Sequence, residues 1–342
     1  MQHPTRVGKY DVEQFLGGGM SHVYRARDRV LGRRVALKIL TEHGVADAEA
    51  KARFLQEARM ASNIKHENVI SVYDFGEEQG RPFMVMEYLE GESLRQAIRN
   101  GRSGDFHRRV RIAIMVARAL DYIHANKIIH RDVKPENIHI DASGKVTLMD
   151  FGIAKTEGVE LTRPGFTLGT PYYMGPEQVL GKPLTPQADI YSYGVLLFEL
   201  FTGTKPLGGE SVEKIFEKIL NEPLNLEPLK KLKLPTVISE IIAKCTAKDP
   251  AQRPQSLEGV CDQLEALLDG TKPAATQLPE NVPTITTVIP APDSVRAPAL
   301  PAFIEKLPAP LRSQGGLMLL AGATVVALLL FLYVTLTMMH VV

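Results

Sequence analysis

Apolar and polar positions in the early part of the chain predict several short strands and one helix. We expect strand, glycine turn and strand over residues 10–23, and a buried strand in the apolar run at residues 35–40. Residues 48–64 are rich in helix formers and predict a helix. Two further apolar runs, at residues 69–75 and 83–88, predict two more strands.

Helical spacing replaces this pattern further along. Ser93 is placed to cap a short helix, and residues 108–125 repeat apolar side chains on one helix face, which favours core packing over a binding role. Residues 138–140 and 146–149 flank a turn and predict a hairpin, and residues 195–201 predict a buried helix. The apolar stripe of the long helix consists of Val110, Ile114, Ala117, Leu120 and Ile123.

The last part of the chain has a different composition. Prolines recur among Ala, Thr and Val over residues 271–313, which predicts an extended, semi-rigid and disordered linker. Residues 317–339 contain no charged residue. About 23 residues at about 1.5 Å each give about 34 Å, enough to cross a bilayer, and no further domain is predicted that could bury such a helix.

Basic residues precede this apolar stretch, namely Arg296, Lys306 and Arg312. The positive-inside rule therefore predicts a single-pass membrane protein with its folded part in the cytoplasm and its C-terminus across the membrane.

Composition narrows the class of protein. The chain has 342 residues with 44% hydrophobic content, which is enough for a large folded domain, and a net charge of +1, which argues against nucleic-acid binding driven by overall charge. Its two cysteines, Cys245 and Cys261, match no zinc spacing and no disulfide framework, so we expect both to pack in a core.

Polar groups are densest at residues 130–137, where the sequence is HRDVKPEN. Phosphoryl transfer requires a carboxylate beside the attacking hydroxyl, a cation near the phosphate, and oxygen ligands for Mg²⁺, and this stretch contains all three types of group. Another carboxylate, Asp150, follows the predicted hairpin. The hairpin would bring Asn137 and Asp150 together.

These residues resemble the catalytic and metal-binding loops of the eukaryotic-like protein kinases, here of the bacterial Ser/Thr type. The motif H-R-D-x-K-x-x-N is matched in full, and D-F-G follows at residues 150–152. The resemblance implies that Asp132 is the base, that Lys134 offsets charge on the γ-phosphoryl group, and that Asn137 and Asp150 hold metal. Lysine at position 134 resembles the Ser/Thr-specific branch.

Further motifs match in the N-terminal part, with one departure. The glycine-rich loop is one residue short of the family pattern, with Ser21 in place of its third glycine. Lys38 is similar to the family's phosphate-binding lysine and Glu57 to its helical partner, with Glu49 and Glu67 as alternative partners. The resemblance implies a nucleotide site formed by Leu16, Gly17, Gly18, Gly19, Ser21, Val23, Ala36, Lys38, Glu57, Glu87 and Leu89.

Residues 87–91 resemble the family's hinge between the two lobes. The resemblance implies that Met86 gates the pocket behind the adenine base. His139 stands where the family has a large apolar residue under the adenine. The favoured interpretation is a core histidine whose ring is satisfied. The alternatives are that the ring stacks on the base or forms a hydrogen bond nearby, or that it lowers nucleotide affinity. Residues 153–170 resemble the activation loop.

Several contacts follow from the same resemblance. Glu177 would form a buried ion pair with Arg253, and Asp189 would brace the backbone of the catalytic loop. We expect Thr162 or Thr167 to be autophosphorylated and to pair with Arg131. Thr170 is expected to bridge Asp132 and Lys134.

We therefore predict an α+β, bilobal protein-kinase fold at residues 7–268, with an N-lobe at 7–86, a hinge at 87–91 and a C-lobe at 92–268, followed by the linker and one transmembrane helix. The implied function is a membrane-tethered Ser/Thr protein kinase that uses ATP and Mg²⁺, with Mn²⁺ as an alternative ion. Protein substrates are the expected partners, with no nucleic acid, and homodimerisation for trans-autophosphorylation stays open. A weakly active pseudokinase scaffold and a small-molecule kinase are the competing hypotheses.

Overall fold

The computed structural model describes residues 3–150, 171–206 and 211–270, all of which belong to one unit of the chain, Met1–Thr276. The predicted activation loop, proline-rich linker and membrane span lie outside the described residues. Within the described ranges, no helix has the length and apolar character needed to cross a membrane.

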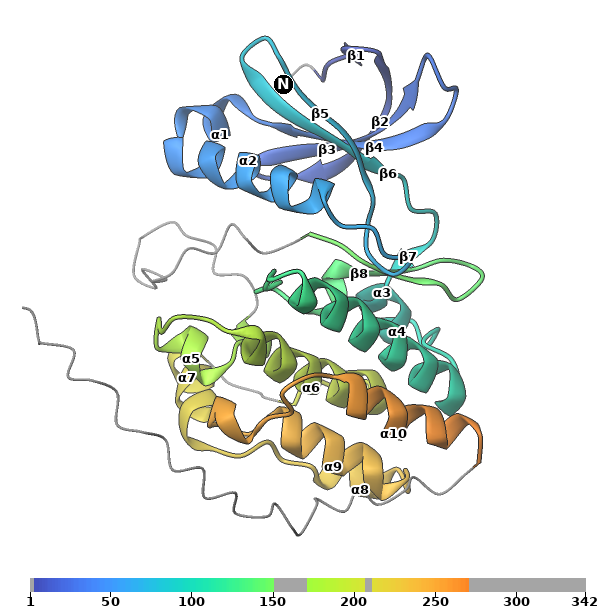
Figure 1. Cartoon of the computed structure of the whole chain (residues 1–342), viewed down its shortest axis with the longest axis vertical. Coiled ribbons are helices and arrows are strands. Elements are labelled where there is room, and N and C mark those ends of the chain that lie inside the picture. Colours follow the sequence, from blue (N-terminus) through green and yellow to red (C-terminus); the bar gives the residue numbers. More distant parts are fainter. Residues whose placement is uncertain (1–2, 151–170, 207–210, 271–342) are drawn as a thin grey trace, which may run out of the picture. The chain divides into compact units, whose positions relative to one another are not determined.

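The N-terminal lobe is an antiparallel six-stranded sheet in the order β1-β2-β3-β4-β6-β5, with a helix against it (Figure 1). Because side chains alternate along a strand, Val35, Leu37 and Ile39 of β4 fill the lobe's own core, whereas Ala36 and Lys38 point to the opposite face. The elements are β1 Arg6–Val7, β2 Tyr10–Gly18, β3 Ser21–Asp28, β4 Arg34–Leu40, α1 Glu42–Ala46, α2 Ala48–Ser62, β5 Val72–Glu78 and β6 Arg81–Glu87.

Helix α2 confirms the helix predicted at residues 48–64. Asp47 caps it by accepting hydrogen bonds from the backbone N–H groups of Glu49 and Ala50. Phe54 and Ala58 are buried on its inner face. The short helix α1 was not predicted.

The strand predicted at residues 69–75 was wrong by three residues, because β5 begins at Val72. Val69 forms an isolated bridge with Leu148, and the N–H of Ile70 donates to the Leu148 carbonyl at 3.0 Å. Both apolar side chains are buried in the core that they share with Leu148, so packing between the lobes removes them from the strand.

The C-terminal lobe is built around helix α6, which is buried nearly all along its length and begins with Pro186. Gly203 ends it in the left-handed conformation, with φ of 73°. The helices of this lobe are α3 Leu94–Arg99, α4 Phe106–Ala125, α5 Pro176–Val179, α6 Pro186–Thr202, α7 Val212–Asn221, α8 Glu227–Lys231, α9 Thr236–Cys245 and α10 Glu258–Leu268, with 3₁₀ helices η1 Pro135–Asn137, η3 Pro171–Tyr173 and η4 Pro250–Gln252.

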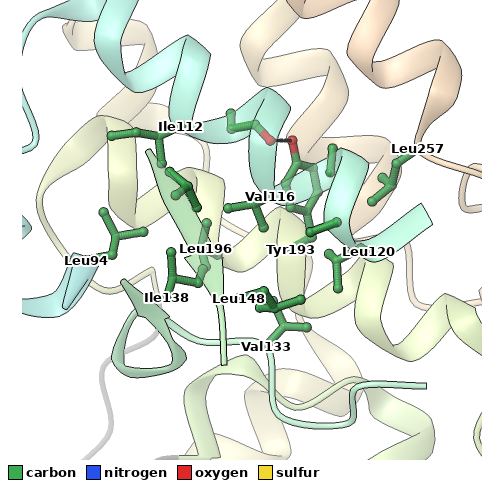
Figure 2. Packing of buried hydrophobic residues seen from close by; sticks show 14 of the residues in the cluster. Leu94, Ile112, Val116, Leu120, Val133, Ile138, Leu148, Tyr193, Leu196 and Leu257 are labelled. Carbon is green, nitrogen blue, oxygen red and sulfur yellow. Dashed lines mark hydrogen bonds between the residues drawn. The ribbon is translucent and has the colours of Figure 1, made fainter. Parts of the chain in front are cut away.

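Helix α4 supplies the predicted apolar stripe, and Figure 2 shows its Val116 and Leu120 beside Leu196 and Tyr193 of α6. It begins two residues before the predicted start because Asp105 caps it. The Tyr193 hydroxyl, buried in this core, donates to the Ala113 carbonyl at 3.0 Å (Figure 2). Cys245 and Cys261 are free and buried in the same core, and burial raises the pKa of each thiol to about 12, which fits their predicted packing role.

The predicted hairpin is present as β8 Ile138–Ile140 and β9 Val146–Leu148, and β7 Glu92–Ser93 adds a third strand to it. Ser93 also caps α3 in a capping box with Gln96, as predicted for the cap. Asn68 ties the N-terminal lobe to this hairpin, since its amide donates to the Val146 carbonyl and its own carbonyl accepts from the Leu148 N–H, both at 2.8 Å.

Candidate active site

The backbone of the catalytic loop is held by Asp189, the first-turn carboxylate of α6. Its Oδ2 accepts from the His130 N–H at 2.7 Å and its Oδ1 accepts from the Arg131 N–H at 2.8 Å, as predicted. Arg131 has a φ of 66°, a left-handed conformation that costs energy for a residue with a Cβ. Its carbonyl accepts from the Gln178 amide at 3.1 Å, so both sides of the strained residue are restrained.

His130 is a structural residue of this loop. It is fully buried, and burial lowers the pKa of its imidazole, so the ring is neutral. Its Nε2 lies 3.0 Å from the Met149 carbonyl and its Nδ1 lies 3.3 Å from the Asp132 N–H. These contacts assign the Nε2–H tautomer, which links the catalytic loop to the residue before Asp150.

Three of the predicted catalytic side chains meet at Asp132. The Lys134 Nζ lies 2.6 Å from Asp132 Oδ2, and the Asn137 Nδ2 donates to the same oxygen at 3.0 Å and to the Asp132 carbonyl at 2.9 Å. Both charged side chains are mostly buried, with 17% of Asp132 and 18% of Lys134 exposed. The carboxylate is therefore fixed in direction while its edge stays open to solvent.

Asp150 is positioned through its neighbour. The Met149 N–H donates to the Asn137 carbonyl at 2.8 Å, and the Met149 carbonyl faces His130. Asp150 follows with a left-handed φ of 48°, and its side chain is 51% exposed. The hairpin thus joins the backbones beside Asn137 and Asp150, as the sequence predicted.

Lys38 connects the two lobes. Its Nζ lies 2.7 Å from Glu57 Oε1 on α2 and 3.4 Å from Asp150 Oδ1. Burial alone would lower the pKa of this ammonium, but the carboxylates of Asp150 and Glu57 outweigh burial, so the net pKa is raised. Of the three candidate partners, Glu57 is the one that pairs with Lys38. Glu49 pairs instead with Arg53.

Oxygen donors suited to Mg²⁺ are present at this point. The Asn137 amide nitrogen is turned toward Asp132, which leaves its amide oxygen as the available donor, and Asp150 presents a half-exposed carboxylate. An amide oxygen and a carboxylate, completed by water and phosphate oxygens, fit the ligand preference of Mg²⁺. Among the described residues, no cluster of three or more His, Cys, Asp or Glu side chains offers a competing metal site.

The predicted nucleotide-binding residues of the N-terminal lobe are neighbours through strand register. Val23 pairs with Lys38 across β3 and β4, and Ala36 pairs with Met86 across β4 and β6. Leu16, Gly17, Gly18, Gly19 and Ser21 form the end of β2, the turn and the start of β3. Glu87 ends β6 and Leu89 lies in the segment that links the lobes. Their contacts to a nucleotide stay a prediction.

The glycine turn makes a contact that the sequence did not reveal. The Met20 carbonyl accepts from both the N–H and the hydroxyl of Thr41, at 3.0 and 2.9 Å. A Cβ on Gly44 of α1 would stand 2.6 Å from the same carbonyl, so only glycine permits the approach. Helix α1 therefore holds the tip of the loop.

The sequence analysis also did not identify two residues that help to hold the catalytic loop, His124 and Arg95. His124, in the last turn of α4, places its Nε2 2.8 Å from Asp189 Oδ2 and extends the brace of the catalytic loop. Arg95 joins Glu136 of the catalytic loop to Glu199 of α6. A polar residue on an otherwise apolar helix face was the available signal for His124.

The buried ion pair predicted at the base of this lobe is present. Arg253 and Glu177 form two hydrogen bonds, at 2.6 and 2.9 Å, and 3% of Arg253 and 7% of Glu177 are exposed. The guanidinium also donates to the carbonyls of Gln187, Ala247 and Lys248.

His139 differs from the favoured interpretation of a satisfied core histidine. Its neighbours Ile138 and Ile140 face the core. The His139 ring points the other way and lies beside Gly91, in the hinge segment between the lobes. A Cβ on Gly91 would stand 3.0 Å from the His139 Nε2. That nitrogen is buried and has no hydrogen-bond partner within the described part of the chain.

We expect His139→Leu to raise the thermal stability of the protein. An unpaired buried polar atom costs about 1–3 kcal/mol, and an apolar side chain removes that cost. Because each kcal/mol shifts the melting temperature of a domain of this size by about 2–4 °C, the expected rise is about 2–12 °C, measured by differential scanning calorimetry. His107→Leu, at an exposed position of α4, is the matched control. A lower melting temperature for His139→Leu would show that the nitrogen has a stabilising partner.

Comparisons with known proteins place this chain among protein kinases. The family model described as the protein kinase domain matches residues 10–264. The chain is 38% identical over 269 residues to the serine/threonine-protein kinase PrkC of Bacillus subtilis, covering 78% of this chain and 41% of that protein. It is 39% identical to the serine/threonine-protein kinase pkn3 of Myxococcus xanthus (77% and 50% covered) and 36% identical to PknA of Mycobacterium tuberculosis (79% and 63%).

The chain therefore spans less than two thirds of the length of these relatives. Among solved structures, the crystal structure of Rad53 residues 1–466 in complex with AMP-PNP superposes with a TM-score of 0.60 at 24% identity, covering 72% of this chain and 62% of that one. This likeness shows the bilobal fold.

Proposed function

The chain belongs to the protein kinase domain family, and from that premise we propose that it transfers the γ-phosphoryl group of ATP to serine and threonine hydroxyls of proteins. The curated relatives named above are serine/threonine-protein kinases, which supports this acceptor class. Lys134, two residues after Asp132, is consistent with the same branch.

One observation supports the proposal more than any other. Side chains from both lobes converge through a chain of direct contacts, from Glu57 to Lys38 to Asp150, and through Met149 to Asn137 and Asp132. Phosphoryl transfer depends mainly on positioning and on charge stabilisation, and this arrangement brings a cation, a base and metal ligands together through direct contacts.

Each side chain then has a defined task. Lys38, held by Glu57, binds the α- and β-phosphates, and Asp132 orients the acceptor hydroxyl and takes its proton. Lys134 offsets charge on the transferred group. Asn137 and Asp150 would hold Mg²⁺, with Mn²⁺ as an alternative, and the ion supplies neutralisation of phosphate charge when bound. The hinge backbone at Glu87 and Leu89 would bond the adenine.

The test is transfer of label from γ-labelled ATP to a general protein acceptor by the full chain. Phosphoamino-acid analysis should yield phosphoserine or phosphothreonine and no phosphotyrosine, and EDTA should stop the reaction. The competing scaffold hypothesis, motivated by the short glycine loop and by His139, predicts no transfer above that of Asp132→Asn. Label found only on small molecules would indicate the third hypothesis.

We further propose that the kinase activates itself, with Thr162 or Thr167 phosphorylated and paired with Arg131. Both threonines lie outside the described residues. Homodimerisation at the membrane would allow transfer between two copies. Mass spectrometry that finds both threonines unmodified in an active preparation would remove this part of the proposal.

Residues 317–339 are proposed as a membrane anchor, with the kinase domain in the cytoplasm and the C-terminus across the bilayer. We expect the full chain to pellet with membranes and to resist carbonate extraction, and a chain ending at residue 270 to be soluble. The matched control deletes residues 271–310 and keeps the apolar stretch, so it should still pellet. Release of the full chain by carbonate alone would contradict the anchor.

A further inference from the structure

The tip of the glycine-rich turn is tied to the segment that follows strand β4. Gly19 and Met20 form this tip, between strands β2 and β3. Ser21 pairs with Leu40 across β3 and β4, and the next residue after Leu40, Thr41, continues this line of contacts to Met20. The tip is therefore connected to the strand that carries the predicted phosphate-binding lysine.

The Thr41 hydroxyl has two partners at once. It donates to the Met20 carbonyl at 2.9 Å and accepts from the Gly44 N–H at 3.1 Å, which makes Thr41 the N-cap of α1. A hydroxyl has one proton to donate and lone pairs to accept, so both bonds form together. One side chain thus joins the tip of the loop to the start of a helix.

A tip that is already held lowers the cost of binding a nucleotide. A glycine-rich turn binds phosphate through its backbone N–H groups, but the freedom of glycine makes a loose turn expensive to order. The base of this turn is fixed by its own geometry, because Gly18 has a φ of 138° and a Cβ there would clash with the Ser21 carbonyl. The contact from Thr41 fixes the tip as well, so the ordering of both parts precedes nucleotide binding.

We propose that Thr41 is a positioning residue, whose hydroxyl holds the Met20 carbonyl and thereby keeps the tip of the glycine loop in place for the phosphates of ATP. The inference rests on the proposed kinase function and adds to its nucleotide site a residue outside the motifs of the family resemblance. Thr41 acts through Met20 and not through contact with the nucleotide. Loss of the hydroxyl therefore weakens the binding of nucleotides that carry phosphates and leaves the transfer step unchanged.

Three substitutions at position 41 separate the loop contact from the helix cap. Thr41→Ser keeps both bonds of the hydroxyl. Thr41→Asp keeps the cap, because a carboxylate accepts from the Gly44 N–H, but it has no proton to give to the Met20 carbonyl. Thr41→Val has nearly the shape of threonine and loses both bonds. The backbone N–H of residue 41 still donates to Met20 in every variant, which limits the expected loss.

The measurements are kcat and the KM for ATP of the full chain in detergent, with dissociation constants for ATP with Mg²⁺ and for adenosine from titration calorimetry. For Thr41→Asp and Thr41→Val we expect the KM and Kd for ATP to rise about threefold to tenfold, the range of one net hydrogen bond. The value of kcat should stay within about twofold of the wild type, since the reacting groups are not touched.

Two comparisons should show no change. Thr41→Ser should match the wild type in the KM and Kd for ATP, because serine restores the hydroxyl. Affinity for adenosine, which has no phosphate, should be the same in all variants. Ser211→Ala is the matched control for the loss of a cap, because Ser211 caps α7 in the C-terminal lobe, and it should keep wild-type values.

Each remaining result counts against the inference. Wild-type KM in both Thr41→Asp and Thr41→Val overturns it, and a loss in Thr41→Val alone assigns the effect to the helix cap. A loss in Thr41→Asp alone, or one that disappears at about 0.5 M salt, assigns the effect to charge repulsion. If Thr41→Val does not fold, Thr41→Asp at this salt concentration decides. Equal losses for ATP and adenosine indicate general damage. A wild type that neither binds ATP nor transfers label removes the proposed function itself.

Discussion

Asp132→Asn should lower kcat for protein phosphorylation by roughly 10²–10⁴-fold, the contribution typical of a positioned acid or base. Asparagine has nearly the same shape as aspartate and can keep the contacts to Lys134 and Asn137, but it cannot take the proton of the attacking hydroxyl. The Lys38, Glu57 and Asp150 contacts are not touched by the change. The KM for ATP should therefore stay within about twofold.

Steady-state kinetics with varied ATP would measure both constants, and circular dichroism would verify that the variant is folded. Asp141→Asn is the matched control, because Asp141 caps the turn between β8 and β9 and does not face the acceptor. It should retain wild-type kcat. A variant at Asp132 that keeps more than a tenth of the activity would assign the proton to another group.

Arg253→Met should destabilise the protein by about 3–5 kcal/mol, because it leaves the Glu177 carboxylate buried without its cation. Three backbone carbonyls also lose their donor. We expect the urea midpoint of the C-terminal lobe to fall sharply, with activity lost at temperatures where the wild type is stable. The direction follows from desolvation, since the charge cannot be rehydrated without opening the fold.

A double variant tests this reason. Glu177→Leu combined with Arg253→Met removes both charges and should recover part of the lost stability, because a buried ion pair adds little net stability over an apolar pair. Lys230→Met breaks the exposed pair with Glu227 and should change the unfolding free energy by less than about 1 kcal/mol. Equal losses for Arg253→Met and Lys230→Met would contradict the role of burial.

The central part of the site could be predicted because its residues are close in sequence. Asp132, Lys134 and Asn137 lie on one short loop, and a hairpin of predictable register returns the chain to Asp150. The choice of Glu57 came from the family resemblance, with spacing in its favour, and is confirmed by its contact with Lys38. The brace by Asp189 and the Glu177–Arg253 pair came from the family resemblance, not from local pattern.

The remaining contacts depend on tertiary packing between distant segments. Arg95 meets residues far along the chain, and no spacing in the sequence marks them. Val69 and Ile70 have strand composition, yet packing against Leu148 takes them out of β5. The position of Gly91 beside the His139 Nε2, an atom without a hydrogen-bond partner among the described residues, likewise follows from tertiary packing.

A single carboxylate, that of Asp189, sets the backbone on which Asp132 stands, and His124 fixes that carboxylate from the end of α4. The loop therefore loses its conformational entropy when the domain folds, and this cost does not recur in each catalytic cycle. An incoming substrate therefore meets a loop whose backbone is already ordered.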